Sequence, residues 1–482
     1  MLNINKIKAD KTTASSNSFL NNLSKESCKT LTQNGAVTYE STSSYLLDFF
    51  AQAGAMRTNP TEALNLFKKA FAENELYAIR TLFYLRDVRG GQGERTLFRN
   101  CLEWLGTDYP EVFNKIVEHV PEFGRWDDLF FDNEKCFDLI SKQLDKDKKE
   151  EKPSILAKWL PTINASSDNT RAKARFMANK LGLSDIGYRK TLREIRKKID
   201  TVEESMSSRK WDEINYSTVP SQASRIYKNA FKKHDEERYS TFVAKATKGE
   251  VKINSATLYP YQIYKSVEKD YSPTLDALWA QLPDYTQGKN ALVVADVSGS
   301  MNGDPIAVSV SLALYFAEKN KGQFKDHFIT FSNNPKLQRI VGKTLKQKMD
   351  CIESSELGMS TNLLSVFTLL LNTAIRNETP KEELPETIYV ISDMEFNKAC
   401  RDVPQYDIIK DTYERAGYTV PNIVFWNVNA SGKNIPAQKH EEGVALVSGF
   451  SPIIFKIAVE NKTPEQIMLD TINSERYEKI TI

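Results

Sequence analysis

The sequence of 482 residues has little of what marks several common classes of protein. Four histidines and five cysteines are scattered along it, and no two cysteines form a Cys-x-x-Cys pair. Dispersed cysteines favour reduced thiols in a cytoplasm-like compartment over a disulfide framework, and their spacing matches no zinc site. No segment approaches the roughly 20 apolar residues of a membrane span, and the N-terminal residues lack the apolar run of a signal peptide. These absences predict a cytoplasmic protein that does not enter a membrane.

Signatures of catalysis are also scarce. The chain has no convincing Ser-His-Asp or Cys-His arrangement, and residues 90–95 lack the spacing of a P-loop. An aspartyl nucleophile of the phosphatase type would need a second acid two residues after Asp296, where the chain has Ser298. We therefore predict a protein that is not an enzyme. The enzymatic alternative that stays open is a hydrolase that activates water on a bound metal.

The net charge is only +2 at neutral pH, but the charges are unevenly distributed. Residues 187–252 contain 16 Lys and Arg against 10 Asp and Glu, whereas residues 291–482 contain 20 against 24. A local excess of positive charge can attract a polyanion even when the whole chain is nearly neutral. The first half of the chain is therefore the better candidate for binding nucleic acid.

A chain of this length exceeds the usual size of one hydrophobic core, so we expect at least two domains. Residues 1–44 are rich in Ser, Thr, Asn and Lys, which predicts a flexible N-terminal arm. Residues 45–272 repeat apolar side chains at helical spacing, as in Ala63, Phe67 and Phe71. This pattern predicts an all-α domain, either a helical-repeat solenoid or an irregular bundle. No strict repeat period is visible in it.

After a junction at residues 273–289, residues 290–482 alternate apolar strands with helices. This alternation predicts an α/β domain with a doubly wound parallel sheet. We expect strands at 291–295, 327–331, 387–391, 422–427 and 443–447, and helices at 305–319, 363–376 and 407–416. The helix at 305–319 also alternates like a strand, but Asp304 followed by Pro305 favours a helix start.

The sharpest motif follows the first of these strands, where Asp296, Ser298 and Ser300 stand at alternate positions. In open α/β sheets, ligands gather beyond the carboxyl ends of the strands. Thr361 precedes an apolar helix and offers another hydroxyl, and Asp393 ends a second apolar strand. Ligands that are all oxygen atoms suit a hard cation such as Mg²⁺ or Mn²⁺. The five residues therefore predict a divalent-metal site.

These residues resemble the metal-ion-dependent adhesion site of the von Willebrand factor A family, which combines an Asp-x-Ser-x-Ser loop with a later Thr and a later Asp. The resemblance implies that Ser298, Ser300 and Thr361 bind the metal directly, and that Asp296 and Asp393 act directly or through water. It also implies an open coordination position that accepts an acidic group from a partner protein.

Several phrases of the first half resemble the TROVE module of Ro-type RNA-binding proteins, and more closely domain of unknown function 2828. They include the segments that begin at Arg86, Phe123, Lys158 and Leu192. Both families place a helical-repeat, HEAT-like domain before a von Willebrand A domain. The resemblance implies a ring or solenoid of helices that binds small structured or misfolded RNAs as a ribonucleoprotein.

Local charge suggests which residues contact RNA phosphates in such a protein. The candidates are Arg171, Lys173, Arg175, Arg189, Arg193, Arg196 and Lys197. The last four stand at three- and four-residue spacing, so a helix would place them on one face. The glycine-rich segment at residues 90–93 and the segment at residues 125–127 are better explained as structural turns.

Two functions fit these observations. The first is a non-enzymatic scaffold that binds RNA through its helical half and a metal through its A-like domain. The second is a metal-dependent protein–protein adaptor with no RNA role, in which an Asp or Glu of the partner completes the metal site.

Overall fold

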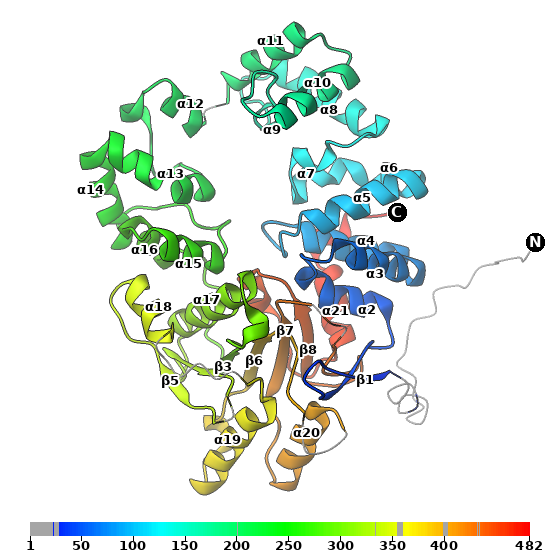
Figure 1. Cartoon of the computed structure of the whole chain (residues 1–482), viewed down its shortest axis with the longest axis vertical. Helices are drawn as coiled ribbons and strands as arrows, with labels where there is room; N and C mark the ends of the chain where they lie inside the picture. Colours follow the sequence, from blue (N-terminus) through cyan, green and yellow to red (C-terminus); the bar gives the residue numbers. More distant parts are fainter. Residues whose placement is uncertain are drawn as a thin grey trace, which may run out of the picture.

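A computed structural model describes residue 23 and residues 28–199, 201–332, 334–353, 360–398, 403–430, 432 and 434–482. These residues form a helical part followed by an α/β part (Figure 1). The predicted fold class is therefore confirmed. No helix among the described residues is long and apolar enough to cross a membrane.

The helical part consists of short helices in series. They are α2 (Tyr45–Gln52), α3 (Pro60–Glu73), α4 (Glu75–Arg86), α5 (Thr96–Asp108), α6 (Pro110–Ile116), α7 (Val120–Phe123), α8 (Glu134–Lys149), α9 (Leu156–Trp159), α10 (Asp168–Lys180), α11 (Asp185–Arg196), α12 (Val202–Ser207), α13 (Ser221–His234), α14 (Glu236–Thr247), α15 (Pro260–Lys269) and α16 (Pro273–Ala280). Short 3-10 turns lie between them at η1 (Ala53–Ala55), η2 (Val117–His119), η3 (Trp126–Leu129) and η4 (Trp211–Glu213).

The local sequence sets where these helices begin. Asn59 caps α3 by accepting a hydrogen bond from the Glu62 amide, and Pro60 occupies the first helical position. Residues 273–289, which we expected to be a junction, contain α16. Pro273 starts that helix, and its apolar face, including Leu275, is buried.

The α/β part is built on a six-stranded sheet in the order β5-β4-β3-β6-β7-β8. All neighbouring strands are parallel except β5, which pairs antiparallel with β4. The strands are β3 (Ala291–Ala295), β4 (His327–Thr330), β5 (Leu337–Arg339), β6 (Thr387–Ser392), β7 (Asn422–Asn427) and β8 (Val444–Ser448). The helices of this part are α17 (Asp304–Lys319), α18 (Leu345–Glu353), α19 (Leu363–Arg376), α20 (Gln405–Arg415), α21 (Pro464–Ile472) and α22 (Glu475–Glu478), with 3-10 turns η5 (Gly299–Met301), η6 (Lys381–Glu383) and η7 (Pro452–Lys456).

The segment from Cys28 to Ser44, which the sequence assigned to a flexible arm, instead packs on the α/β part. It contains the antiparallel strands β1 (Lys29–Leu31) and β2 (Val37–Tyr39). Tyr39 exchanges backbone hydrogen bonds with Ile435, at 2.9 and 3.1 Å. These long-range contacts order a segment whose own composition is weakly structured. Residues 1–22 and 24–27 of the predicted arm lie outside the described residues.

The helices follow an arc, and both of its ends rest on the α/β part (Figure 1). At the first end, the Gly54 amide donates to the Ser448 hydroxyl at 3.0 Å. A Cβ at Gly54 would stand 2.7 Å from the Ser448 carbonyl oxygen, so this close approach requires glycine. At the other end, α15 packs on α17.

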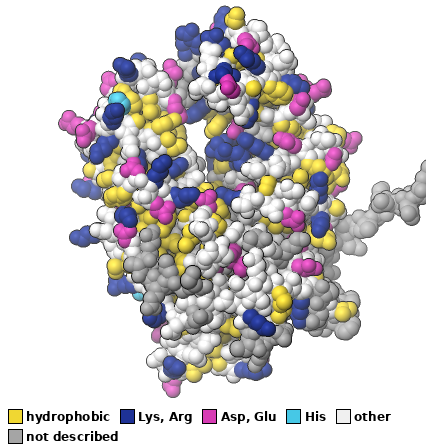
Figure 2. Space-filling view, viewed as in Figure 1, with side chains coloured by type: hydrophobic (Ala, Val, Ile, Leu, Met, Phe, Trp, Pro, Cys, Tyr) yellow, Lys and Arg dark blue, Asp and Glu magenta, His cyan; other side chains and the backbone are white. Residues whose placement is uncertain are grey.

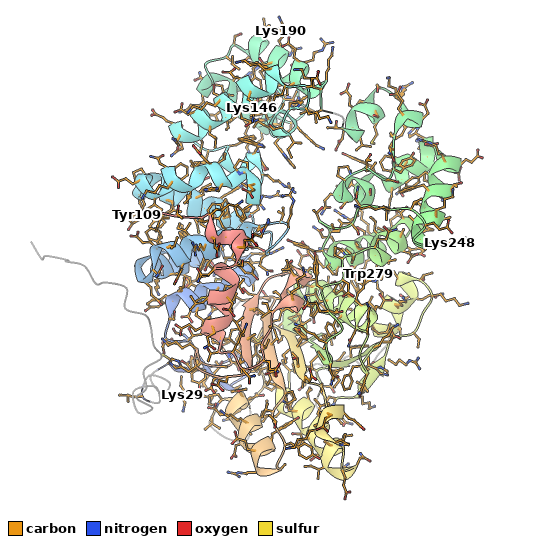
Figure 3. The ribbon with its side chains drawn as sticks, turned by 180° about the vertical axis from the view of Figure 1, so that it is seen from behind. Lys29, Tyr109, Lys146, Lys190, Lys248 and Trp279 are labelled. Carbon is orange, nitrogen blue, oxygen red and sulfur yellow. The ribbon has the colours of Figure 1, made fainter. Side chains whose placement is uncertain are left out.

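One side chain of the α/β part contacts both ends of the arc. The Arg57 guanidinium, just after η1, lies 3.7 Å from the centre of the Phe450 ring. Tyr261 of α15 packs edge-on against the same ring, with the ring centres 5.2 Å apart. The described helices therefore form an arc that the α/β part closes, and the opening enclosed by it is visible from both sides (Figures 2 and 3).

Candidate metal and nucleic-acid sites

The metal motif lies where the strand order of the sheet reverses. β3 and β6 are parallel neighbours, but the chain leaves β3 toward β4 and returns at β6. Such a switch point opens a crevice beyond the carboxyl ends of the two strands. Asp296 directly follows β3 and Asp393 directly follows β6, so the topology brings both predicted acids to this crevice.

Hydrogen bonds connect the loops that carry these acids. The Ser392 hydroxyl donates to Oδ2 of Asp296 at 2.6 Å, and the Ser298 amide donates to Oδ1 at 2.9 Å. The hydroxyls of Ser298 and Ser300 are 3.1 Å apart. Asp296, Ser298 and Asp393 are buried, whereas Ser300 is exposed. The loop therefore reaches solvent on the side of Ser300.

Thr361, the fifth predicted ligand, lies beside the loop that follows β6. Its carbonyl oxygen accepts a hydrogen bond from the amide of Asn397 at 3.0 Å. Its side chain is 2% exposed and forms no hydrogen bond with any residue that the structure describes. The Thr361 hydroxyl is thus available as a ligand.

The electrostatics of the crevice fit a cation. Burial, followed by the charge of Asp393, raises the pKa of Asp296 to about 6. Neither carboxylate forms an ion pair with a Lys, Arg or His within the described part of the chain, and Oδ2 of Asp393 is buried without a hydrogen-bond partner. A divalent cation would supply both missing interactions, so the residues present fit Mg²⁺ or Mn²⁺.

Three or more His, Cys, Asp or Glu side chains do not cluster as a metal site anywhere among the described residues. This does not count against the site, because a motif of two carboxylates and three hydroxyls needs no such cluster. The five predicted residues lie on loops at one end of β3 and β6. Their role as metal ligands stays a prediction.

A further acid supports the loop after β6. Met394 adopts a left-handed conformation with φ of 65°, which is uncommon for a residue with a side chain. This turn lets the amide of Glu395 donate to Oδ1 of Asp393 at 3.1 Å. The Glu395 carboxylate in turn accepts hydrogen bonds from the Gln33 amide at 2.7 Å and the Asn434 amide group at 2.5 Å. The segment before α2 therefore helps to fix the position of Asp393.

Some of the side chains predicted to contact RNA already form hydrogen bonds or ion pairs within the protein, and others do not. Arg196 donates to the carbonyls of Ala157 and Leu160, each at 2.7 Å, and to the Thr162 hydroxyl at 2.9 Å. Its guanidinium thus holds the turn after α9, which weakens the prediction that it contacts RNA.

The two arginines predicted on α10 also have partners. Arg171 donates to the Ala165 carbonyl at 2.8 Å and pairs with Asp168, and Arg175 pairs with Asp185 at 3.5 Å. Lys173 is exposed, and no described residue forms an ion pair with it.

The remaining predicted contacts lie together on one face of α11, as the spacing required. Arg189, Arg193 and Lys197 are exposed and line a hollow of about 580 Å³. None of the three forms an ion pair within the described part of the chain. We call these three side chains the α11 face.

A second basic site lies inside the arc and was not predicted. We call it the lumen pocket: a hollow of about 480 Å³ between the two arms of the arc. Figure 2 shows Lys and Arg side chains gathered along part of the opening. The lining of the pocket includes Arg57, Arg89, Arg95, Arg125, Trp159 and Tyr259.

Three of the arginines that line the lumen pocket, Arg89, Arg95 and Arg125, form no ion pair among the described residues. Burial first, and then the like charge of Arg95, lower the pKa of Arg125, although an arginine stays protonated. The Arg125 guanidinium lies over the indole of Trp159, 4.5 Å from the ring centre. Positive charge is thus concentrated in this hollow, and Asp127 and Asp128 offset the charge of Arg125 only at a distance.

The sequence predicted that Arg125 belongs to a structural turn, and this holds for its backbone but not for its side chain. Its amide donates to Oδ2 of Asp128 at 2.9 Å, and that carboxylate is also held by buried Arg86 at 2.7 Å. The backbone at Arg125 is structural, but its side chain enters the pocket. The local sequence Gly-Arg-Trp indicated the turn, but nothing in it indicated that the side chain lines a pocket.

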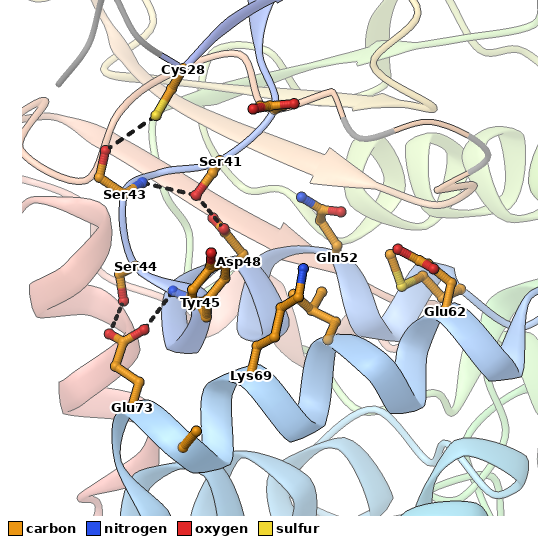
Figure 4. A pocket seen from close by; sticks show the side chains of 14 residues that line it. Cys28, Ser41, Ser43, Ser44, Tyr45, Asp48, Gln52, Glu62, Lys69 and Glu73 are labelled. Carbon is orange, nitrogen blue, oxygen red and sulfur yellow. Dashed lines mark hydrogen bonds between the residues drawn. The ribbon is translucent and has the colours of Figure 1, made fainter. Parts of the chain in front are cut away.

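A hollow of about 830 Å³ near the first helices has an acidic lining (Figure 4). Two of these carboxylates, those of Glu73 and Asp48, serve the fold. Glu73 accepts hydrogen bonds from the Ser44 hydroxyl at 2.7 Å and the Tyr45 amide at 2.6 Å, which ties α3 to the start of α2. Asp48 accepts from the Ser41 hydroxyl at 2.6 Å. These acids have partners already and need no ligand.

Comparison with known proteins gives two family models. Residues 32–130 and 183–297 match the model described as "Domain of unknown function (DUF2828)". The resemblance to DUF2828 is confirmed. Residues 290–480 match a second model, "Domain of unknown function (DUF7788)".

The DUF2828 match contains most of the lumen pocket. Arg89, Arg95 and Arg125 fall in its first segment and Tyr259 falls in its second, whereas Trp159 lies between the two. The DUF7788 match contains all five predicted metal ligands.

The chain is also similar to whole proteins. "Uncharacterized protein L728" of Acanthamoeba polyphaga mimivirus is 28% identical over 499 residues, which cover 92% of this chain and 86% of that protein. The crystal structure of Deinococcus radiodurans RO (RSR) protein aligns with 11% identity, 90% of this chain and 100% of that chain, and a TM-score of 0.32.

Proposed function

We propose that this protein is a non-enzymatic scaffold of the cytoplasm that binds RNA in the lumen pocket. The main support is the group formed by Arg89, Arg95 and Arg125. These three arginines concentrate positive charge in one hollow and form no ion pair among the described residues. Phosphate groups are natural partners of such arginines, because a guanidinium donates hydrogen bonds to two oxygens at once.

The aromatic side chains of the pocket favour single-stranded RNA. Trp159 comes from α9 and Tyr259 from the start of α15, so rings line both arms of the opening. Unpaired bases stack on such rings, while a duplex hides its bases. The α11 face gives a second set of free cations, farther along the chain, that a longer RNA would also contact.

A fluorescence anisotropy titration with a fluorescent single-stranded RNA tests this function. We expect binding at low salt, with a slope of log affinity against log salt of about −2 for three phosphate contacts. Arg95→Ala with Arg125→Ala should weaken binding at least tenfold. Lys248→Ala is the matched control, because Lys248 is an exposed cation on the outer side of the arc (Figure 3). Absence of binding at low salt would contradict the proposal.

The A-like domain of this scaffold would hold Mg²⁺ or Mn²⁺ on Asp296, Ser298, Ser300, Thr361 and Asp393. The support is the pair of buried, unpaired carboxylates at the switch point of the sheet. A bound cation would neutralise their repulsion. Isothermal titration with Mn²⁺ should give one site in the wild type and none in Asp296→Ala.

An adaptor function is the second candidate, and the exposure of Ser300 favours it. A metal that is buried on the side of the two acids but open beside Ser300 could take a carboxylate from a partner protein. Partners captured by the wild type should then be released by EDTA and should not be captured by Asp296→Ala. Capture that is insensitive to both changes would contradict this function.

A further inference from the structure

The charges of the lumen pocket can be balanced pair by pair. Glu94 is the one acid among its described lining residues, and it forms an ion pair with Arg57. Arg86, which also lines the pocket, is held by Asp128 at 2.7 Å. Arg89, Arg95 and Arg125 form no ion pair within the described part of the chain, although Asp127 and Asp128 act on Arg125 at a distance. Three guanidinium groups are therefore left without a direct acidic partner.

Three positive charges are more than one internal phosphate of a strand requires. A phosphodiester carries one negative charge, whereas a phosphate monoester carries about −1.5 to −2 near pH 7 and offers three acceptor oxygens. A terminal monoester together with the first diester of the strand brings the negative charge close to three.

The volume of the pocket also favours a strand end. At about 480 Å³ it lies in the lower part of the range of roughly 300–1,000 Å³ that is usual for small-ligand sites. A space of this size accommodates one or two nucleotides. The closed arc and the contacts at Phe450 bound it on the side of the α/β part.

One donor of the pocket is already placed for a ligand. The Arg89 guanidinium is held by the Glu122 carbonyl at 3.3 Å, so one end of its fork is fixed. The indole nitrogen of Trp159 is buried and has no hydrogen-bond partner among the described residues. That buried N–H group carries a desolvation cost, and other atoms of Trp159 line the pocket.

We propose that the lumen pocket binds the terminal phosphate monoester of a single RNA strand, with the terminal base stacked against Trp159. This inference rests on the proposed RNA-binding function and narrows it to strand ends that carry a phosphate. The monoester is bound by Arg95 and Arg125, and Arg89 contacts the next phosphate along the strand.

Four fluorescent eight-nucleotide RNAs of one sequence test this inference. They carry a 5′-phosphate, a 3′-phosphate, both phosphates, or hydroxyls at both ends, with the dye on an internal base. The wild type should bind at least one singly phosphorylated RNA about tenfold more tightly than the hydroxyl-ended RNA. The two RNAs that carry a single phosphate show which end of the strand is recognised. AMP should compete with the preferred RNA, and adenosine should not.

Variants separate the end preference from RNA binding itself. Arg95→Gln and Arg125→Gln should each lose the preference, and Lys248→Ala should keep it. Gln retains hydrogen bonding and most of the volume, and unchanged melting temperatures would show that both variants fold.

Equal affinity of the wild type for all four RNAs would overturn the inference while the scaffold function stood. Binding of none of them at low salt would overturn both. A preference that survives in both Gln variants would place the end outside the lumen pocket and would also overturn the inference.

Discussion

The metal crevice and the lumen pocket hold like charges together, but with opposite sign. In the crevice, two carboxylates on adjacent parallel strands lack a cation. In the lumen pocket, three arginines from turns between helices lack an anion. Each arrangement costs stability in the absence of a ligand, and each is retained by a framework that is well packed around it. Charges without a direct partner, and not the number of charged residues, therefore mark the candidate sites.

The largest effect is expected when a paired and an unpaired arginine of the same region are each replaced and the free energies of unfolding are compared. Arg86 is 1% exposed and binds Asp128, so Arg86→Ala would leave a buried carboxylate with one of its cations removed. We expect the free energy of unfolding to fall by about 3–5 kcal/mol. Arg95→Ala, at an exposed and unpaired position, should change it by less than about 0.5 kcal/mol. Urea denaturation measures both, and equal losses would remove the distinction.

The metal crevice should become more stable when one charge is removed. Burial, followed by the charge of Asp393, raises the folded-state pKa of Asp296 from its usual value near 4 to about 6, so the folded protein holds this proton more tightly than the unfolded chain does. Stability from this group is therefore present below pH 4 and is lost as the pH rises through 6, by up to about 3 kcal/mol. Asp296→Asn should recover it in metal-free protein at pH 7 and add nothing at pH 4.

Chemical denaturation of metal-free wild type and Asp296→Asn at both pH values makes that comparison. With Mn²⁺ at about 1,000 times the dissociation constant the order should reverse, because the variant loses the ligand. A bound metal then adds about 4.1 kcal/mol to the wild type, which exceeds the roughly 3 kcal/mol that the variant recovers at pH 7. A variant that is less stable at every pH, with or without metal, would contradict this explanation of the crevice.

Removing a charge from the lumen pocket should have the corresponding effect on RNA. Arg125→Gln relieves the repulsion with Arg95 and should leave the melting temperature unchanged or slightly raised. RNA affinity should fall about tenfold, and the salt slope should become shallower by about 0.7 for one lost phosphate contact to a single strand. Anisotropy at several salt concentrations checks this. A lower melting temperature with unchanged affinity would show that Arg125 is structural.

The smallest effect on RNA affinity is expected on α11, where substitutions of Arg196 and Arg193 should have different consequences. Arg196→Ala removes three hydrogen bonds to the segment after α9 and should cost about 1–3 kcal/mol of stability. Arg193→Ala should leave stability unchanged and weaken the binding of a long RNA a few-fold. Affinity that does not respond to Arg193→Ala would exclude the α11 face from the RNA path.

The sequence predicted five strands and three helices of the α/β part because their signals are local, whereas the helices α18, α21 and α22 were not predicted. The strand at residues 291–295 is apolar throughout, and Asp304 with Pro305 correctly marked the start of α17. The strand β5 (Leu337–Arg339) was missed, since three residues show no period and pair only with β4. The hairpin before α2 was missed because distant partners such as Ile435 order it.

The two sites differ in the same way. The metal motif could be predicted because Asp296, Ser298 and Ser300 are close in sequence and directly follow a strand. The lumen pocket gathers Arg89, Arg125 and residues of α15 from separate segments, so no spacing reveals it. Counting basic residues also cannot separate paired from unpaired arginines, because pairing depends on the fold.

The central claim is that RNA enters the lumen pocket, and photo-crosslinking tests it most directly. A single-stranded RNA with 4-thiouridine at its terminal positions would be irradiated with the protein, and the crosslinked peptides identified by mass spectrometry. We expect crosslinks to the peptides that contain Trp159 and Tyr259, and we expect an excess of AMP to abolish them. Crosslinks found only on peptides outside the lumen pocket would contradict it.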